Sequence, residues 1–181
     1  NCNVAVIKVQ DGLSLNINGK ADASSKRDMF TQLFSGYLPV ILHTNPQDIF
    51  ILGLGSGVTL GACVQFGVAN VECAEIEPAV IEAAKFFSEQ NHNVVGTHRE
   101  KIIAADGRNY LLSASKKYDI ISTEPSNPWM AGIANLFSKD FYEICKTRLK
   151  KDGLICQWIH GYNLSPDDFQ MIIATFHSVF P

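Results

Sequence analysis

Hydrophobic and polar residues alternate at the start of the chain and then change period. Residues 4–10 and 13–19 alternate in the manner of short strands, and the Asp-Gly pair between them is a two-residue hairpin signal. The polar stretch 20–27 is expected to be a connector. Over residues 28–43 apolar side chains recur every three or four positions, which predicts a helix that Pro39 kinks or ends.

From residue 48 onward the strand and helix patterns alternate five times. The expected strands are residues 48–53, 70–75, 100–104, 118–123 and 153–159. The expected helices are residues 57–66, 78–90, 107–115, 138–150 and 165–178. This alternation predicts an α/β fold, a mainly parallel sheet with helices on both faces, preceded by a small N-terminal β-hairpin element. We expect residues 1–46 to form the hairpin and linking helix, and residues 47–181 to form the α/β domain.

Composition excludes several classes of function. The 181 residues include 15 basic and 18 acidic side chains, a formal net charge of −3, which argues against nucleic acid as the main partner because phosphate binding needs clustered Lys and Arg. No apolar run reaches the roughly 18 residues that a membrane span requires. The five cysteines form no Cys-x-x-Cys pair and the five histidines are scattered, so we expect no metal site and a soluble, cytoplasmic chain.

A glycine-rich turn follows the first expected strand of the α/β region. Gly53, Gly55 and Gly57, with Ser56 among them, stand where a strand passes into a helix, and glycines at such a turn let backbone amides approach a ligand closely. The dinucleotide fingerprint requires a glycine where Val58 stands, so NAD and FAD are disfavoured. We associate this spacing instead with S-adenosyl cofactors. The alternative is a turn whose glycines serve chain geometry alone.

Acidic residues stand where the next two strands are expected to end. Glu75 lies 22 residues after Gly53, close to the spacing at which an acid accepts hydrogen bonds from ribose hydroxyls. Asp106 is placed to face an exocyclic amine, and Gly107 would let a base lie against the backbone. Asp106 also suits the N-cap of the following helix. The plainer alternatives are a solvated strand end for Glu75 and a helix cap for Asp106.

The loop after the fourth expected strand carries the candidate for catalysis. Ligands of an open α/β sheet bind at the carboxyl ends of the strands, so this loop should face the glycine turn. Glu124 is a candidate general base, and Asn127 and Trp129 are candidates for orienting or shielding a substrate amine. The alternative is a rigid turn, stiffened by two prolines, with a half-buried tryptophan.

Six blocks of the chain resemble, in order, the spermidine synthase (polyamine aminopropyltransferase) family. They are Gly53-Leu54-Gly55-Ser56-Gly57, Glu75-Ile76-Glu77-Pro78, Asp106-Gly107, Tyr118-Asp119-Ile120-Ile121, Leu136-Phe137-Ser138-Lys139-Asp140-Phe141-Tyr142 and Leu149-Lys150-Lys151-Asp152-Gly153. The family fold is a small β-element followed by a methyltransferase-like (Rossmann-like) α/β domain. The resemblance implies decarboxylated S-adenosylmethionine as donor, a polyamine or other amine as acceptor, methylthioadenosine as by-product, and a homodimer.

The resemblance also implies which residues bind the donor. Glu75, with Ile76 beside it, matches the acid that binds the ribose, and Asp106 with Gly107 matches the pair that contacts adenine. The family usually carries an aspartate where this chain has Ser56, and that carboxylate holds the cationic end of the donor. Gly53, Gly55, Ser56 and Gly57 are nevertheless expected to bind the donor.

On the acceptor side the resemblance implies a second set of residues. Glu124 stands where the family has its catalytic aspartate, which deprotonates the attacking amine. Gln32 matches a position that contacts substrate, and Asp22 falls where the hairpin connector carries a glutamine. Asn127 replaces a substrate-binding aspartate, and we place Trp129 beside it in the substrate site.

Three further blocks narrow the resemblance and leave alternatives open. Gly19-Lys20-Ala21-Asp22-Ala23-Ser24, Glu124-Pro125-Ser126-Asn127-Pro128-Trp129-Met130-Ala131-Gly132 and Gln157-Trp158 are similar to the spermidine-synthase-like domain that follows a multi-pass membrane region in bacterial proteins. That similarity implies a domain of a longer protein. The alternatives are a methyltransferase that uses intact S-adenosylmethionine, whose carboxylate Ser56 would tolerate, and a non-catalytic sensor of nucleosides or polyamines.

Overall fold

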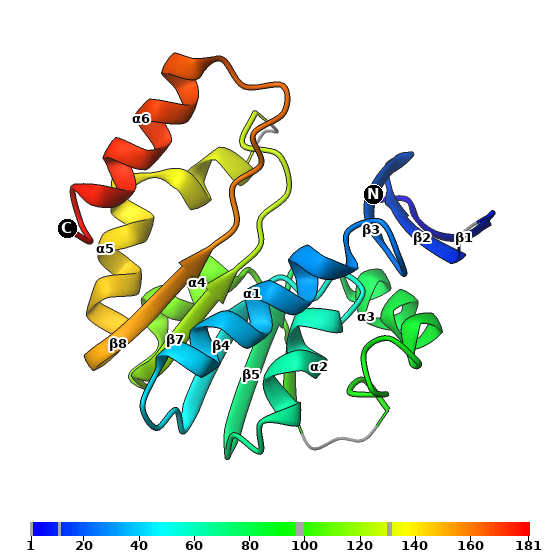
Figure 1. Cartoon of the computed structure of the whole chain (residues 1–181), viewed down its shortest axis with the longest axis horizontal. Coiled ribbons are helices and arrows are strands. Elements are labelled where there is room, and N and C mark those ends of the chain that lie inside the picture. The colour runs from blue at the N-terminus through cyan, green and yellow to red at the C-terminus, as the bar shows by residue number, and fades with distance from the viewer. Residues whose placement is uncertain (1, 11, 97–99, 130–131) are drawn as a thin grey trace.

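The chain folds into two β-sheets of unequal size with helices around them (Figure 1). The structure is a computed structural model that describes residues 2–10, 12–96, 100–129 and 132–181. The larger sheet is parallel, with the strand order β6-β5-β4-β7-β8. Its strands are β4 (Asp48–Leu52), β5 (Asn70–Glu75), β6 (Lys101–Ala104), β7 (Tyr118–Thr123) and β8 (Leu149–Gln157). The helices that follow are α2 (Val58–Gln65), α3 (Pro78–Ala84), η1 (Lys85–Phe87), α4 (Gly107–Ser113), η2 (Ile133–Phe137), α5 (Lys139–Arg148) and α6 (Pro166–His177).

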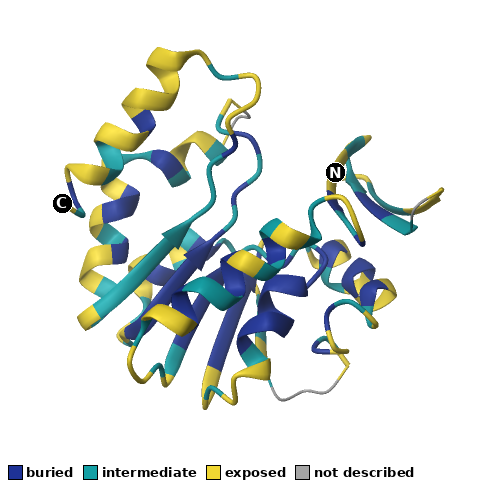
Figure 2. Ribbon diagram, in the orientation of Figure 1, coloured by how far each residue is buried: buried dark blue, intermediate teal, exposed yellow. Residues whose placement is uncertain are grey.

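Helices cover both faces of this sheet, and its central strands are therefore buried (Figure 2). Successive side chains of β4 point to opposite faces, because a strand has a period of two. Ile49 and Ile51 join a core cluster with residues of α2, whereas Phe50 and Leu52 join a second cluster with residues of α4 and α5. The predicted α/β fold class is therefore confirmed.

The smaller sheet differs from the prediction by one strand. It is antiparallel and contains β1 (Val4–Val9), β2 (Gly12–Ile17) and β3 (Lys20–Ser24) in that order. The prediction of a connector over residues 20–27 was wrong, because Asn18 and Gly19 both have positive φ angles, 51° and 82°, and turn the chain straight back along β2. Apolar residues of this sheet pack on α3 and η1.

Helix α1 (Met29–Leu42) joins the two sheets and lies against α2 (Figure 1). Pro39 is inside the helix and does not end it. Proline has no backbone N–H, so the carbonyl four residues earlier loses its usual helical donor. That carbonyl, of Ser35, accepts a hydrogen bond of 3.0 Å from the Ser122 hydroxyl on β7. The division of the chain near residue 46 stays a prediction.

Two boundaries of predicted helices also differ. The regular α-helical part of the stretch predicted over 78–90 ends at Ala84 and continues as the 3-10 helix η1. The helix predicted over 138–150 ends at Arg148, because Leu149 already pairs with Tyr118 of β7. The register of that pair shifts before Ile120, which accommodates the longer β8.

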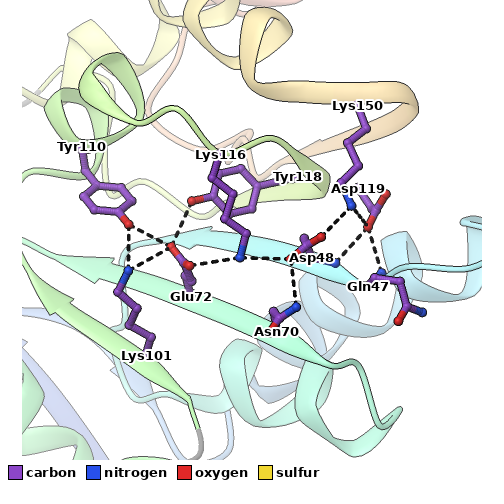
Figure 3. A network of polar contacts seen from close by, with 10 residues as sticks. All are labelled: Gln47, Asp48, Asn70, Glu72, Lys101, Tyr110, Lys116, Tyr118, Asp119 and Lys150. Carbon is purple, nitrogen blue, oxygen red and sulfur yellow. Dashed lines mark hydrogen bonds and ion pairs between the residues drawn. The ribbon is translucent and has the colours of Figure 1, made fainter.

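A network of lysines and acids joins the strands near their amino ends (Figure 3). Lys150 Nζ lies 2.6 Å from Asp48 and 2.9 Å from Asp119, and Lys116 Nζ lies 3.0 Å from Asp48 and 3.1 Å from Glu72. Burial raises the pKa of each of the three carboxyl groups, but hydrogen bonds to the lysines and other donors outweigh it, so each pKa is lowered. The network therefore lies at the opposite ends of the strands from the candidate site, whose residues are at the carboxyl ends.

Candidate functional site

The strand order gathers the predicted site at one edge of the parallel sheet. Neighbouring strands β6, β5, β4 and β7 end side by side. Glu75 is the last residue of β5, and Asp106, the glycine turn and Glu124 follow β6, β4 and β7 respectively. The chain builds outward from β4 in one direction and then returns to add β7 on the other side, so β4 and β7 flank a topological switch point. Open α/β sheets bind ligands at such a point.

The glycine turn has the geometry that close approach of a ligand requires. Gly53 and Gly55 have φ angles of 92° and 53°, in the left-handed region that disfavours other residues. A Cβ placed on either residue would meet no atom within 4 Å, so the backbone there faces open space. Gly57, the third glycine, is the N-cap of α2, and that helix therefore begins at the turn.

Glu75 ends β5 and fixes the position of the glycine turn. Its Oε2 accepts a 2.9 Å hydrogen bond from the backbone N–H of Leu54, and its Oε1 accepts one of 2.9 Å from the N–H of Glu77. Burial raises the pKa of this carboxyl group, and the backbone donors partly offset that rise. The backbone N–H of Gly55 is a third donor to this carboxylate, which has about four lone-pair sites, so room remains for a ligand hydroxyl.

The end of β6 combines a helix cap with a packing glycine. Asp106 caps α4, since its Oδ1 accepts a 3.0 Å hydrogen bond from the N–H of Asn109, and this confirms the predicted N-cap. A Cβ on Gly107 would lie 2.6 Å from Leu52 Cγ, so glycine is required there by core packing. Ile76, after β5, leaves 69% of its surface exposed near the same edge.

A chain of hydrogen bonds connects the glycine turn to Glu124. The Ser56 hydroxyl donates to Gln32 Oε1, and Gln32 Nε2 donates to the Ser24 carbonyl at 3.0 Å. The Thr59 hydroxyl lies 3.0 Å from the Gln32 carbonyl and 2.9 Å from Glu124 Oε2. Three predicted site residues, Gln32, Ser56 and Glu124, are thus brought together, and Thr59 is a residue that sequence reasoning missed.

Glu124 has the electrostatic environment of a proton-transfer group. Burial raises the pKa of its carboxyl group to about 7, and the negative charges of Asp28 and Asp22 act in the same direction. The hydrogen bond from Thr59 lowers the pKa and partly offsets them. Near neutral pH the group is therefore populated in both protonation states, which is the condition for efficient general-base catalysis.

Asp22 brings the small sheet to the loop that carries Glu124. The Ser126 hydroxyl donates to Asp22 Oδ1 at 2.7 Å and accepts from Lys20 Nζ at 2.9 Å. These contacts join β3 to the loop after β7, more than 100 residues away in sequence. Asp22 also lines a cavity of about 550 Å³ with residues that include Asp28 and Tyr162.

Asn127 and Trp129 lie on the same loop in contrasting environments. Asn127 is 4% exposed, and its Oδ1 has no hydrogen-bond partner within the described part of the chain. Trp129 is 47% exposed and places the edge of its ring against His160, with 5.6 Å between ring centroids. His160 follows β8 and was not among the predicted site residues, because a lone histidine gives no sequence signal.

The described residues contain neither a metal-binding cluster nor a membrane-spanning helix. Within residues 2–10, 12–96, 100–129 and 132–181, no three His, Cys, Asp or Glu side chains gather in a way that could hold a metal ion. In the same part of the chain, no helix has the length and apolar character needed to cross a bilayer.

The fold and the residues at the carboxyl edge of its sheet define the class of protein. The methyltransferase-like (Rossmann-like) α/β proteins have a parallel sheet of this kind, with a glycine turn after the first strand and an acid at the end of the second, as β4 and β5 have here. Residues 33–181 match the model of the spermine/spermidine synthase domain. The chain therefore belongs to the spermine/spermidine synthase family.

Known relatives agree in sequence and in fold. The polyamine aminopropyltransferase of Thermotoga petrophila is 27% identical over 171 residues, covering 94% of this chain and 58% of the relative. That of Buchnera aphidicola is 28% identical over 174 residues, covering 93% and 60%. The chain thus spans about three fifths of the length of these curated relatives.

Two solved structures share the fold. A spermidine synthase in complex with the transition state analogue AdoDATO has a TM-score of 0.88 to this chain at 23% identity, covering 98% of this chain and 61% of that one. Spermidine synthase from Thermotoga maritima has a TM-score of 0.84 at 23% identity, covering 99% and 60%. Both similarities are in the fold, that is, in the arrangement of the helices and strands.

Proposed function

We propose that this chain binds decarboxylated S-adenosylmethionine and transfers its aminopropyl group to an amine of the polyamine class. Membership of the spermine/spermidine synthase family and relatives named polyamine aminopropyltransferase support the reaction type. The observation that carries the proposal is Glu124, a partly buried carboxyl group with a pKa of about 7, linked by hydrogen bonds to the glycine turn.

The donor would bind along the carboxyl edge of β4, β5 and β6. Open space above Gly53 and Gly55 would admit the donor close to the backbone, with Ser56 and Gly57 completing the turn. Glu75 would accept hydrogen bonds from the ribose hydroxyls through its remaining lone pairs. Ile76, Asp106 and Gly107 would surround the adenine, and the first of these offers an exposed apolar side chain for the base.

The transfer needs one proton to be removed and two groups to be aligned. The amine nitrogen forms a bond to the aminopropyl carbon while the carbon–sulfur bond of the donor breaks. The electron pair of the broken bond stays on sulfur, and methylthioadenosine leaves. The proton of the amine passes to Glu124. Alignment of nitrogen and carbon at about 3 to 3.5 Å supplies most of the remaining acceleration.

The acceptor would approach from the side of the small sheet. Asp22 and Asp28 place negative charge near Glu124, which favours a cationic amine. Gln32 and Asn127 would supply neutral polar contacts, and the exposed ring of Trp129 would shield the bound amine from water.

A turnover assay tests this proposal. Incubation with decarboxylated S-adenosylmethionine and putrescine should release methylthioadenosine, and Glu124→Gln should abolish release while methylthioadenosine binding persists. Glu82→Gln is the matched control, since Glu82 is an exposed acid that pairs with Lys85 on the surface. Full activity of Glu124→Gln would remove the proposed base, and ligand binding by the wild-type chain without any product would favour a sensor.

A methyltransferase is the second candidate, and Ser56 favours it. The Ser56 hydroxyl is neutral and hydrogen-bonded to Gln32, so this position holds no charge that would repel the carboxylate of intact S-adenosylmethionine. Calorimetry with the intact and the decarboxylated donor separates the two candidates. Tighter binding of the intact donor would select the methyltransferase.

We also propose that the chain is a cytoplasmic domain of a longer protein that includes a membrane region. It would form a homodimer. Residues 1–46 and 47–181 would be its two structural divisions. Free cysteines that are buried in the core, Cys63, Cys73 and Cys145, agree with a reducing compartment. Sedimentation equilibrium of the chain tests the dimer directly.

A further inference from the structure

Helix α1 has its polar and apolar side chains on the opposite faces from those expected of a surface helix. The face that packs on α2 and on β7 is mostly polar or small, and its buried residues are Gln32, Ser35, Gly36, Pro39 and Val40. A helix at the surface of a soluble protein normally turns its apolar face inward. No charged side chain occurs between Met29 and Leu42. The outer face of α1 therefore has the character of a contact surface.

The outer face is organised as a single stripe of four residues. They recur at intervals of four, three and four positions, so they lie above one another on a helix of about 3.6 residues per turn. The rings of the first two stack, with 5.4 Å between centroids and 15° between planes. This set, the outer stripe of α1, consists of Phe30, Phe34, Tyr37 and Ile41.

The outer stripe of α1 is open to solvent and continues onto α2. Phe30 is 76% exposed, Phe34 47% and Ile41 66%. Tyr37 meets the ring of Phe66, the exposed C-cap residue of α2, edge-on with 5.5 Å between centroids. A single exposed apolar residue needs no explanation, but a contiguous group of them marks an interaction site.

The size of this surface fits the apolar core of a dimer interface. A standard interface covers about 800 Å² of each partner, and in homodimers about 65% of it is apolar, which is about 500 Å². At their exposed fractions, Phe30, Phe34 and Phe66 offer on the order of 300 Å². Ile41 and Leu42, which is also exposed, add about 100 Å². The surface thus supplies most of the apolar area that a stable dimer needs.

The distribution of charge favours a second copy of the chain over a membrane as the partner. Helices that lie on anionic membranes carry Lys and Arg beside their apolar residues. Helix α1 has neither residue, and the whole chain has a net charge of −3. Two uncharged stripes can pack on each other about a two-fold axis without leaving any charge buried and unpaired.

We propose that the outer stripe of α1, together with Phe66, is the surface through which two copies of this chain form a homodimer. The inference specifies the homodimer of the proposed function and rests on that part of it, but it does not depend on the transfer reaction. The opposite face of α1 carries Gln32, which accepts a hydrogen bond from Ser56 of the glycine turn. The dimer contact would thus support the helix that reaches the candidate site.

Sedimentation equilibrium of matched variants tests this surface. Phe34→Lys and Ile41→Lys each place two ammonium groups in the apolar interface, one from each copy, and should weaken the dimer about a hundredfold or more. Lysine is a good helix former and both positions are exposed, so the variants should keep the wild-type midpoint of urea unfolding within a narrow margin. Phe86→Lys is the control, because Phe86 is 67% exposed but lies in η1.

The proposal expects a dimer for the wild-type chain and for Phe86→Lys, and monomers for the two α1 variants at the same concentration. Unchanged dimerisation of both α1 variants overturns the surface but not the dimer, and an equal loss in Phe86→Lys also overturns it. A monomeric wild-type chain overturns both, and its co-sedimentation with phosphatidylserine vesicles would assign the surface to a membrane. Methylthioadenosine release judges the transfer reaction separately.

Discussion

Thr59→Val isolates the hydrogen bond that holds the candidate base. The Thr59 hydroxyl lies 2.9 Å from Glu124 Oε2, and valine replaces it with a methyl group of nearly the same size. The hydroxyl stabilises the ionised carboxylate, so its removal should raise the pKa of Glu124 further above its value of about 7.

The size of this shift follows from the strength of the bond. A hydrogen bond to a charged group is worth about 1.5 to 3 kcal/mol, and a change of 1.36 kcal/mol moves a pKa by one unit. We take the lower end, because the protonated acid also bonds to the hydroxyl and because the Gln32 carbonyl, 3.0 Å away, competes for its single proton, and expect a rise of about one unit. At pH 7 the ionised fraction then falls from about one half to about one tenth, so the rate should fall about fivefold.

The assay is the pH dependence of kcat/KM for methylthioadenosine release. The wild-type chain should lose activity as pH falls through about 7, because the base becomes protonated. Thr59→Val should move this acid limb upward by about one unit and leave the rate at pH 9 nearly unchanged, whereas Thr59→Ser should behave as the wild type does. An acid limb that stays in place or moves to lower pH would refute the reasoning.

Three further predictions concern the donor site and the fold. Glu75→Ala should weaken methylthioadenosine binding roughly a hundredfold in calorimetry, because ribose contacts and the anchor of Leu54 are both lost, and unchanged affinity would exclude Glu75 from the site. Gly107→Ala should lower the free energy of unfolding in urea by about 1 to 3 kcal/mol, since its Cβ would lie 2.6 Å from Leu52 Cγ, and a neutral result would contradict the packing account. The free energy of unfolding should fall as pH drops below about 4, because the lowered pKa values of Asp48, Glu72 and Asp119 stabilise the fold only while these groups are ionised, and Asp119→Asn should flatten that dependence.

Local signals were sufficient for most of the fold. The apolar run of β4 predicts a central strand, and its residues do alternate between the two core clusters. The missed strand β3 carries a weak apolar pattern, and it forms because the turn at Asn18 and Gly19 directs it back along β2. Of the two expectations for Pro39, only the end of α1 is contradicted, because the helix continues to Leu42 and the Ser122 hydroxyl supplies the donor that the proline lacks.

The candidate site was predictable only where it follows the strand ends. Glu75 is the last residue of its strand, and the glycine turn and Glu124 come directly after theirs, so their shared edge follows from a parallel sheet. The contact of Thr59 with Glu124 joins residues 65 positions apart and leaves no local pattern. The ring stack of His160 likewise depends on the path of the loop after β8.

A crystal structure of this chain with methylthioadenosine tests the central claim most directly. We expect the nucleoside above Gly53 and Gly55, with its ribose hydroxyls on Glu75, its adenine beside Asp106 and its sulfur facing Glu124. A nucleoside bound elsewhere, or one whose sulfur points away from Glu124, would contradict the account.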